Sequence, residues 1–129
     1  MAHPNEEILR RQDDAQTKGD MDAFWSLFTD DVVVHVAGRS SLAGEHKGKQ
    51  ALQEVYARYM EALGDSPVMT THDILANDEH GVVLYSVRAE REGKTLEART
   101  ANICHFRDGR VSELWSMDED PYTADPFYG

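Results

Sequence analysis

The sequence predicts an α+β fold in which helices cover one face of a curved, mostly antiparallel sheet. Apolar residues at helical spacing are confined to the first half of the chain, whereas strand-like segments separated by short glycine turns fill the second half. Such short turns join antiparallel neighbours. We therefore predict three helices and about five strands in the order ααβαββββ, built as one domain from residues 1–129.

Two helices are predicted at the start of the chain. Pro4 suits the first turn of a helix that runs to about Lys18, where Gly19 supplies the C-terminal stop. Asp20 is placed to cap a second helix. The apolar stripe of this second helix is formed by Met21, Phe24, Leu27 and Phe28, with Trp25 at its edge.

A strand and a long helix follow. The β-branched run from Val32 to Val36 is too short for a helix and predicts a strand that ends at Gly38, followed by a loop from Arg39 to Gly48. The clearest helix spans Lys49 to Leu63, because apolar residues recur there with the period of one helical face and Gly64 follows. These residues are Leu52, Val55, Tyr56, Tyr59 and Leu63.

Four strand-like segments complete the predicted sheet. They cover about 68–76, 82–91, 95–106 and 111–117, and each is followed by a turn rich in glycine, asparagine or acidic residues. In the third of these segments, alternation places Leu96, Ala98, Thr100, Asn102, Cys104 and Phe106 on the inner face. In the fourth segment neither face is cleanly apolar, which suits a sheet whose two faces are both partly buried.

Composition excludes several classes of partner. The net charge of −11 opposes binding to nucleic acid or to an anionic membrane, and no run of about 18 apolar residues is present. The acidic excess lies in residues 1–31 and 111–129, so a pocket built by the middle of the chain favours an uncharged ligand. The first residues lack an apolar signal core, and Cys104 has no second cysteine to pair with, so we expect a cytoplasmic protein.

The common cofactor and metal motifs are absent. The segment from Gly44 to Gln50 is one residue short of a phosphate-binding loop and lacks its Ser or Thr. The six histidines form no metal-binding pattern, and no serine lies in a nucleophile elbow. We therefore predict no cofactor and no metal.

Two stretches of the sequence resemble a known superfamily. They run from Gly19 through Trp25 into Asp30–Gly38, and from Phe106 to Trp115; the tail Asp120–Gly129 is also similar. Together with the order of elements, they resemble the nuclear transport factor 2-like superfamily, in its SnoaL-like and ketosteroid-isomerase-like branch. The resemblance covers the whole chain. It implies a cone formed by a bent sheet and closed by the helices, an apolar pocket inside, and a homodimer through the outer sheet face.

The branch includes isomerases, polyketide cyclases and epoxide hydrolases, and the resemblance places their functional positions on this sequence. Asn102 matches the position where the isomerases carry a protonated Asp of the oxyanion hole, and an amide there can still donate a hydrogen bond to a carbonyl oxygen. The alternative for Asn102 is a core residue whose hydrogen bonds are made within the protein. Ser116 matches the acid–base Asp of the cyclases and epoxide hydrolases, a role that Ser cannot fill unaided. The isomerase base and tyrosine fall near Val36 and at Gln12, so both are absent.

Two residues are candidates for the missing proton acceptor. Asp118 lies two residues past Ser116 and therefore on the same strand face, at the pocket mouth if the geometry of the branch holds; its alternative role is a solvated strand end. His35 lies on the valine-rich strand, where a structural hydrogen bond or a position at the dimer interface is the alternative to catalysis. Four aromatic residues are candidates for either the pocket lining or the core: Trp25, Tyr56, Tyr59 and Tyr85.

We therefore predict that the protein binds a small, apolar, carbonyl-bearing molecule in an internal pocket. Asn102 is expected to donate a hydrogen bond to the ligand, and Asp118 or His35 to accept a proton from the carbon next to the carbonyl. The alternative is a binding or accessory protein of the same fold without catalysis. The replacements that the resemblance implies at Ser116 and Val36 favour that alternative.

Overall fold

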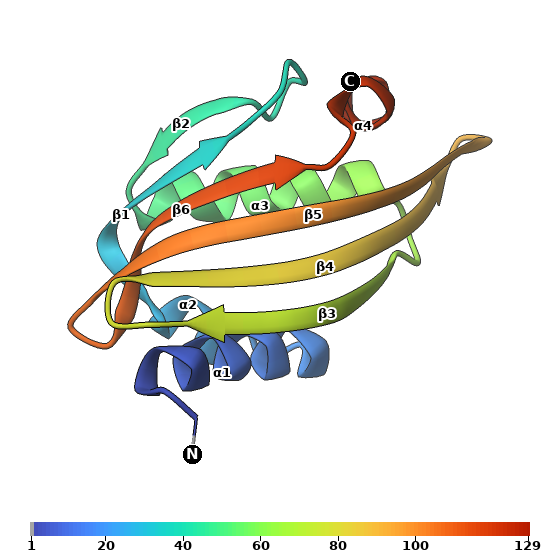
Figure 1. The fold of residues 1–129 in the computed structure, drawn as a ribbon. Helices are drawn as coiled ribbons and strands as arrows, with labels where there is room; N and C mark the ends of the chain where they lie inside the picture. The colour runs from blue at the N-terminus through green and yellow to red at the C-terminus, as the bar shows by residue number, and fades with distance from the viewer. Residues whose placement is uncertain (1) are drawn as a thin grey trace.

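A computed structural model describes residues 2–129 and has the predicted α+β architecture (Figure 1). Helices α1, α2 and α3 lie on one side of a single curved sheet of six strands. The helices are α1 (Pro4–Lys18), α2 (Met21–Ser26), α3 (Lys49–Leu63) and α4 (Pro121–Tyr128). The strands are β1 (Phe28–Val36), β2 (Gly44–Lys47), β3 (Val68–Ala76), β4 (His80–Arg91), β5 (Lys94–Arg107) and β6 (Arg110–Asp118).

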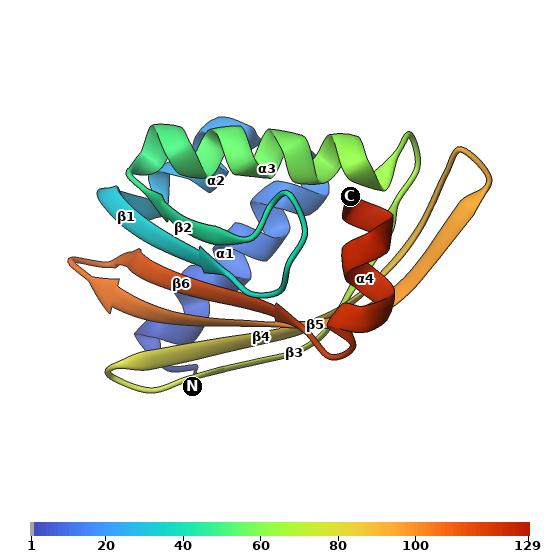
Figure 2. The ribbon, with the colours of Figure 1, turned by 90° about the horizontal axis from the view of Figure 1, so that it is seen from above.

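The sheet has the strand order β2-β1-β6-β5-β4-β3. Only β1 and β6 pair in parallel, and all the other pairs are antiparallel. The long strands β4 and β5 bend along their length, so the sheet is concave toward α1 and α3, while α4 stands at one end of the concave face (Figure 2). The bent sheet and the helices form the cone that the resemblance implied.

The helix boundaries at the start of the chain follow their capping residues. The His3 side chain accepts a hydrogen bond from the backbone of Asn5, and Gly19, with φ of +74°, ends α1 as predicted. Asp20 caps α2 by accepting a hydrogen bond from the Ala23 backbone. This second helix is shorter than its apolar stripe suggests, because Phe28 pairs with Val111 and so begins β1.

Two elements were missed at the sequence level. The predicted loop from Arg39 to Gly48 contains β2, an edge strand of mostly exposed polar residues that carries no apolar alternation. The tail forms α4, which Asp120 caps and Pro121 begins. This helix is held by burial of its last residues, among them Phe127 and Tyr128, against the rest of the core.

A bulge explains why neither face of the last strand, β6, is cleanly apolar in sequence. In β5, Leu96, Thr100 and Cys104 are buried, in agreement with the predicted inner face. The register between β5 and β6 shifts after His105, where a bulge on β6 inserts one extra residue. As a result Val111 and Leu114 both face the core, although a regular strand would place them on opposite sides.

Gly64, which follows α3, provides a test of the tight contact between this helix and the end of β4. Its φ of +84° and ψ of −161° lie in a region that is almost exclusive to glycine, and a Cβ atom there would lie 2.6 Å from the carbonyl oxygen of Glu90. We expect Gly64→Ala to lower the free energy of unfolding by about 3 kcal/mol, measured by urea denaturation.

Gly93→Ala is the matched control for Gly64→Ala. Gly93 also has a positive φ, of +78°, but nothing lies within 4 Å of an added Cβ. Only the backbone strain remains there, so the expected loss is about 1 kcal/mol. Equal losses in the two variants would show that the contact between Gly64 and Glu90 carries no extra constraint.

Candidate functional site

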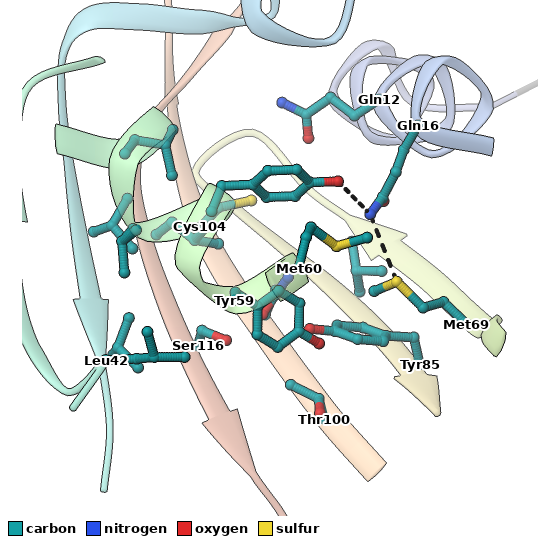
Figure 3. Close-up of a pocket in the computed structure, with 18 of the residues that line it drawn as sticks. Gln12, Gln16, Leu42, Tyr59, Met60, Met69, Tyr85, Thr100, Cys104 and Ser116 are labelled. Carbon is teal, nitrogen blue, oxygen red and sulfur yellow. Dashed lines mark hydrogen bonds between the residues drawn. The ribbon is translucent and has the colours of Figure 1, made fainter. Parts of the chain in front are cut away.

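A cavity of about 530 Å³ lies between the concave face of the sheet and helices α1 and α3 (Figure 3). Its lining is mainly apolar and includes Leu9, Phe24, Phe28, Val34, Leu52 and Val55. The size and the apolar surface are those of a small-molecule site. Most of its polar side chains come from two sides, from α1 on one hand and from the strands β4, β5 and β6 with α3 and α4 on the other.

The register of the sheet brings the polar residues of the cavity floor together. Asn102 on β5 pairs with Ser116 on β6, and both line the cavity. The next inward row pairs Thr100 with Asp118 and, on β4, with Tyr85. Asn102 and Asp118 are therefore diagonal neighbours on one face, a relation that places their Cβ atoms about 7 Å apart.

One oxygen of the Asp118 carboxylate accepts a hydrogen bond, and the other is available to a ligand. The Thr100 hydroxyl donates a hydrogen bond to Asp118 Oδ1 over 2.8 Å, whereas Oδ2 accepts none from residues 2–129. Burial raises the pKa of Asp118, and the nearby carboxylate of Asp125 raises it further, while the hydrogen bond from Thr100 opposes both effects. A carboxylate with a raised pKa and a free oxygen is suited to accept a proton from a ligand.

The Asn102 amide has no partner in the part of the chain that the structure describes. Its Oδ1 atom is buried and accepts no hydrogen bond. A buried polar atom without a partner costs free energy that a bound ligand can recover. Because rotating the amide exchanges its oxygen and nitrogen, the group can present an N–H donor to a ligand.

Three tyrosines form a cluster beside Asp118. Tyr59 from α3 and Tyr85 from β4 point toward each other across the cavity (Figure 3), and the ring of Tyr128 from α4 lies 5.7 Å from that of Tyr59. Burial raises the pKa of all three phenols, and that of Tyr59 is raised well above its usual value. The cluster is therefore uncharged at neutral pH.

The other two aromatic candidates differ in position. Tyr56 lines the cavity, and its hydroxyl accepts a hydrogen bond from Gln16 Nε2 over 3.1 Å. Trp25 packs edge-on against Tyr56, with their ring centroids 5.3 Å apart, but does not line the cavity. The structure therefore places Tyr56 in the candidate site and Trp25 in the layer behind it.

His35 lies on the outer face of the sheet, away from the cavity. Its ring stacks on Trp115 with centroids 4.9 Å apart, and its Nε2 lies 2.7 Å from a carboxylate oxygen of Glu113. Neither His35 nor Trp115 lines the cavity. Of the two proton acceptors considered, only Asp118 faces the cavity, so we leave His35 out of the candidate site.

Sequence reasoning missed the contribution of the tail. Asp125 and Tyr128 of α4 line the cavity, and Asp125 Oδ2 accepts a hydrogen bond from the backbone of Arg39 over 2.8 Å. Gly38 leaves room for this carboxylate, because a Cβ atom at Gly38 would lie 2.6 Å from Asp125 Oδ1. The residue spacing in the tail did not predict a helix, so it did not predict that the tail lines the cavity. The sequence resemblance did include the tail.

The charged groups of the cavity are all acidic. Among residues 2–129, the lining contains Asp13, Asp118 and Asp125 but no lysine, arginine or histidine. Cys104 also lines the cavity, and burial raises the pKa of its thiol to about 12, which keeps it neutral. The site therefore offers an anionic ligand no opposite charge.

The comparisons with known proteins place the chain in a family. The sequence model of the SnoaL-like domain matches residues 9–114. The chain belongs to the SnoaL-like family. A solved nuclear transport factor 2-like protein from Burkholderia xenovorans is 18% identical to this SnoaL-like protein, with 100% of this chain and 98% of that chain covered and a TM-score of 0.79, and so shows the shared fold. The family model confirms the predicted SnoaL-like branch.

Three known proteins show what this SnoaL-like chain is similar to. Bal32a, from a soil-derived mobile gene cassette, is 31% identical, with 99% of this chain and 98% of Bal32a covered and a TM-score of 0.91. The uncharacterised protein Rv0034 of Mycobacterium tuberculosis is 28% identical, with 95% of this chain and 94% of Rv0034 covered. IdmH of Streptomyces antibioticus, a proposed polyketide cyclase, is 18% identical, with 95% and 96% covered and a TM-score of 0.74, and so shows the shared fold.

Proposed function

We propose that this SnoaL-like protein binds a neutral, mainly apolar, carbonyl-bearing molecule in its cavity and transfers a proton at the carbon next to the carbonyl. The Asn102 amide N–H donates a hydrogen bond to the carbonyl oxygen. The free Oδ2 of Asp118 accepts the proton from the neighbouring carbon. The observation that carries the proposal is that Asn102 and Asp118 both line one cavity and that each has a side-chain polar atom without a partner in residues 2–129.

The spacing of the two groups fits this chemistry. A diagonal separation of about 7 Å leaves room for a carbonyl oxygen at one group and the adjacent carbon at the other, each at about 3 Å. The mainly apolar lining strengthens a hydrogen bond to developing negative charge. The description of IdmH as a proposed polyketide cyclase supports the same class of reaction for this chain.

The proposed step moves one proton and one electron pair. Asp118 takes the proton, and the electron pair of the C–H bond forms the carbon–carbon double bond of an enolate. The carbonyl oxygen receives the negative charge, and the amide of Asn102 stabilises it. Delivery of the proton from Asp118 to a conjugated carbon completes an isomerisation. Where the proton on Asp118 first exchanges with solvent, delivery of the solvent proton or deuteron to the same carbon completes a hydrogen exchange.

Binding without catalysis is the second candidate function. By the sequence resemblance, Ser116 matches the position of the acid–base Asp of cyclases and epoxide hydrolases. In the structure it pairs with Asn102, and both line the cavity. A ligand could therefore be held by Asn102 with no proton transferred. The two candidates differ in one observable, the exchange of the ligand's carbon-bound protons.

Proton exchange in D₂O tests the proposed function with 1-tetralone, a cyclic aromatic ketone, as the probe. We expect the protein to bind 1-tetralone and to accelerate the loss of the proton signal next to its carbonyl in ¹H NMR spectra. Binding without accelerated exchange would favour the non-catalytic candidate. Absence of binding by this and other cyclic ketones and enones would contradict both candidates.

We also propose that the outer face of the sheet pairs two copies of the chain. Apolar side chains lie next to one another there because Ile103 pairs with Val82 on one side and with Trp115 on the other. The adjacent outward row contains Leu84, Ala101 and the exposed Met117. None of the helices within residues 2–129 covers this face. Apolar residues at the centre of an uncovered sheet face are typical of an interface between copies.

Ile103→Glu is expected to convert a dimer into a monomer, because a charge at the centre of this face would be buried without a partner. Light scattering coupled to size-exclusion chromatography measures the mass. Tyr122→Glu is the control, since Tyr122 is 92% exposed on α4 and lies off the sheet. A wild-type protein that is monomeric at micromolar concentration would contradict the proposal.

A further inference from the structure

The cavity contains a second set of polar side chains besides those on the sheet. Gln16 from α1 and Tyr56 from α3 meet across the cavity, and Figure 3 shows Met60 and Met69 near them. Two tyrosines of the cluster and two hydroxyl residues of the sheet lie on the other side of these methionines in the same view: Tyr59, Tyr85, Thr100 and Ser116. The cavity therefore has two polar regions with thioether side chains between them.

Gln16 and Tyr56 have hydrogen-bond donors that lack a good acceptor within the protein. Gln16 Nε2 donates to the hydroxyl of Tyr56 and, over 3.8 Å, to the thioether sulfur of Met69. A thioether is a weak acceptor, so one amide proton of Gln16 is poorly satisfied. The Tyr56 hydroxyl accepts from Gln16, and its own proton finds no acceptor in the part of the chain that the structure describes. Two donors are thus available to a ligand.

We infer that the ligand carries a second oxygen, at the end of its apolar body away from the carbonyl, and that Tyr56 and Gln16 bind this oxygen. This inference rests on the proposed function, because the first oxygen is the one assigned to Asn102. The ligand class is a neutral, ring-sized hydroxy ketone or dicarbonyl compound. The methionines between the two polar regions contact the apolar body and, being unbranched, adapt to its shape.

The charges of the cavity support an uncharged second oxygen. No lysine, arginine or histidine among residues 2–129 lines the cavity, and Asp13 lies one helical turn before Gln16. A carboxylate or phosphate at this position would be repelled. Burial raises the pKa of Tyr56, so its hydroxyl keeps the proton that it donates.

Binding measurements with a matched ligand series test the inference. The probes are 1-tetralone and its 5-, 6- and 7-hydroxy derivatives, which place a hydroxyl at different distances from one carbonyl. We expect wild-type protein to bind at least one hydroxy derivative about tenfold more tightly than 1-tetralone in isothermal titration calorimetry, as one or two further hydrogen bonds would produce. Tyr56→Phe and Gln16→Met are expected to remove this preference, so that 1-tetralone and the hydroxy derivatives bind each variant with similar affinity.

The control variant is Gln53→Met, which makes the same change at an exposed position of α3 and is expected to keep the preference. Equal affinity of wild-type protein for 1-tetralone and all three derivatives would overturn the inference and leave the proposed function standing. A lowered melting temperature with an intact preference in Tyr56→Phe would also overturn it, because the pair would then only tie α1 to α3. Failure to bind any of the four ketones would overturn both the inference and the proposed function.

Discussion

Asp118→Asn is expected to lower the rate of proton exchange at 1-tetralone by roughly 100- to 10,000-fold, the usual contribution of a general base. The amide of the variant keeps the shape of the carboxylate and can still accept the hydrogen bond from Thr100, but it cannot take a proton. The affinity for 1-tetralone should change little. Exchange followed by ¹H NMR in D₂O and binding followed by calorimetry separate these two effects.

Glu119→Gln is the matched control for Asp118→Asn. Glu119 is the next residue along the chain, is exposed, and pairs with Arg99 on the outer surface. Its neutralisation removes the same charge from the same strand end without touching the cavity. Exchange that is equally fast in the wild-type protein and in Asp118→Asn would remove Asp118 from the mechanism.

The exchange catalysed by Asp118 should also depend on pH. The groups that face its carboxylate are Thr100, Asp125, Tyr85 and Tyr128, and burial together with Asp125 raises the pKa of Asp118 above its usual 3.8. The base is active when deprotonated, so the rate should rise with pH and level off above this raised pKa. A midpoint at or below 3.8 would contradict the assignment.

Asn102→Leu is expected to change stability and activity in opposite directions. Leucine has nearly the same shape and removes a buried oxygen without a partner, so the free energy of unfolding should increase by about 1 kcal/mol. Loss of the donor to the developing negative charge should lower the exchange rate by about 100-fold or more. Urea denaturation and the D₂O exchange assay measure the two quantities.

The sign of the stability change distinguishes a ligand-binding asparagine from a structural one. If Asn102 were satisfied within the folded protein, its replacement would destabilise the fold and leave exchange unchanged. That result would contradict the role proposed for its amide. Where a binding site contains a polar atom that only the ligand satisfies, replacing that residue is expected to stabilise the ligand-free protein.

Periodicity predicted the parts of this fold that are buried on one side only. The face of α3 that carries Leu52 and Val55 and the inner face of β5 both emerged from spacing, because each buries one regular stripe. The elements β2 and α4 could not be predicted from residue spacing. The residues of β2 are mostly exposed and carry no stripe, and α4 is stabilised by tertiary contacts of its last residues.

The candidate site was predictable only in part, because both faces of the sheet are partly apolar and the sequence does not always show which face a residue occupies. Alternation in β5 placed Asn102 on the inner face, and the two-residue spacing from Ser116 placed Asp118 beside it. The face occupied by His35 could not be deduced, because its strand is valine-rich on both sides and both faces of the sheet are partly apolar. The contribution of Asp125 depends on a contact with the loop at Gly38, which no local pattern encodes.

The carbonyl of the bound ligand offers the most direct test of the central claim. We expect 1-tetralone labelled with ¹³C at its carbonyl to show a downfield shift of that resonance when it binds the wild-type protein, because the amide of Asn102 donates a hydrogen bond to the oxygen. Asn102→Leu should bind the labelled ketone without this shift. A carbonyl resonance that is the same in both proteins would contradict the claim that Asn102 holds the ligand's carbonyl in the cavity.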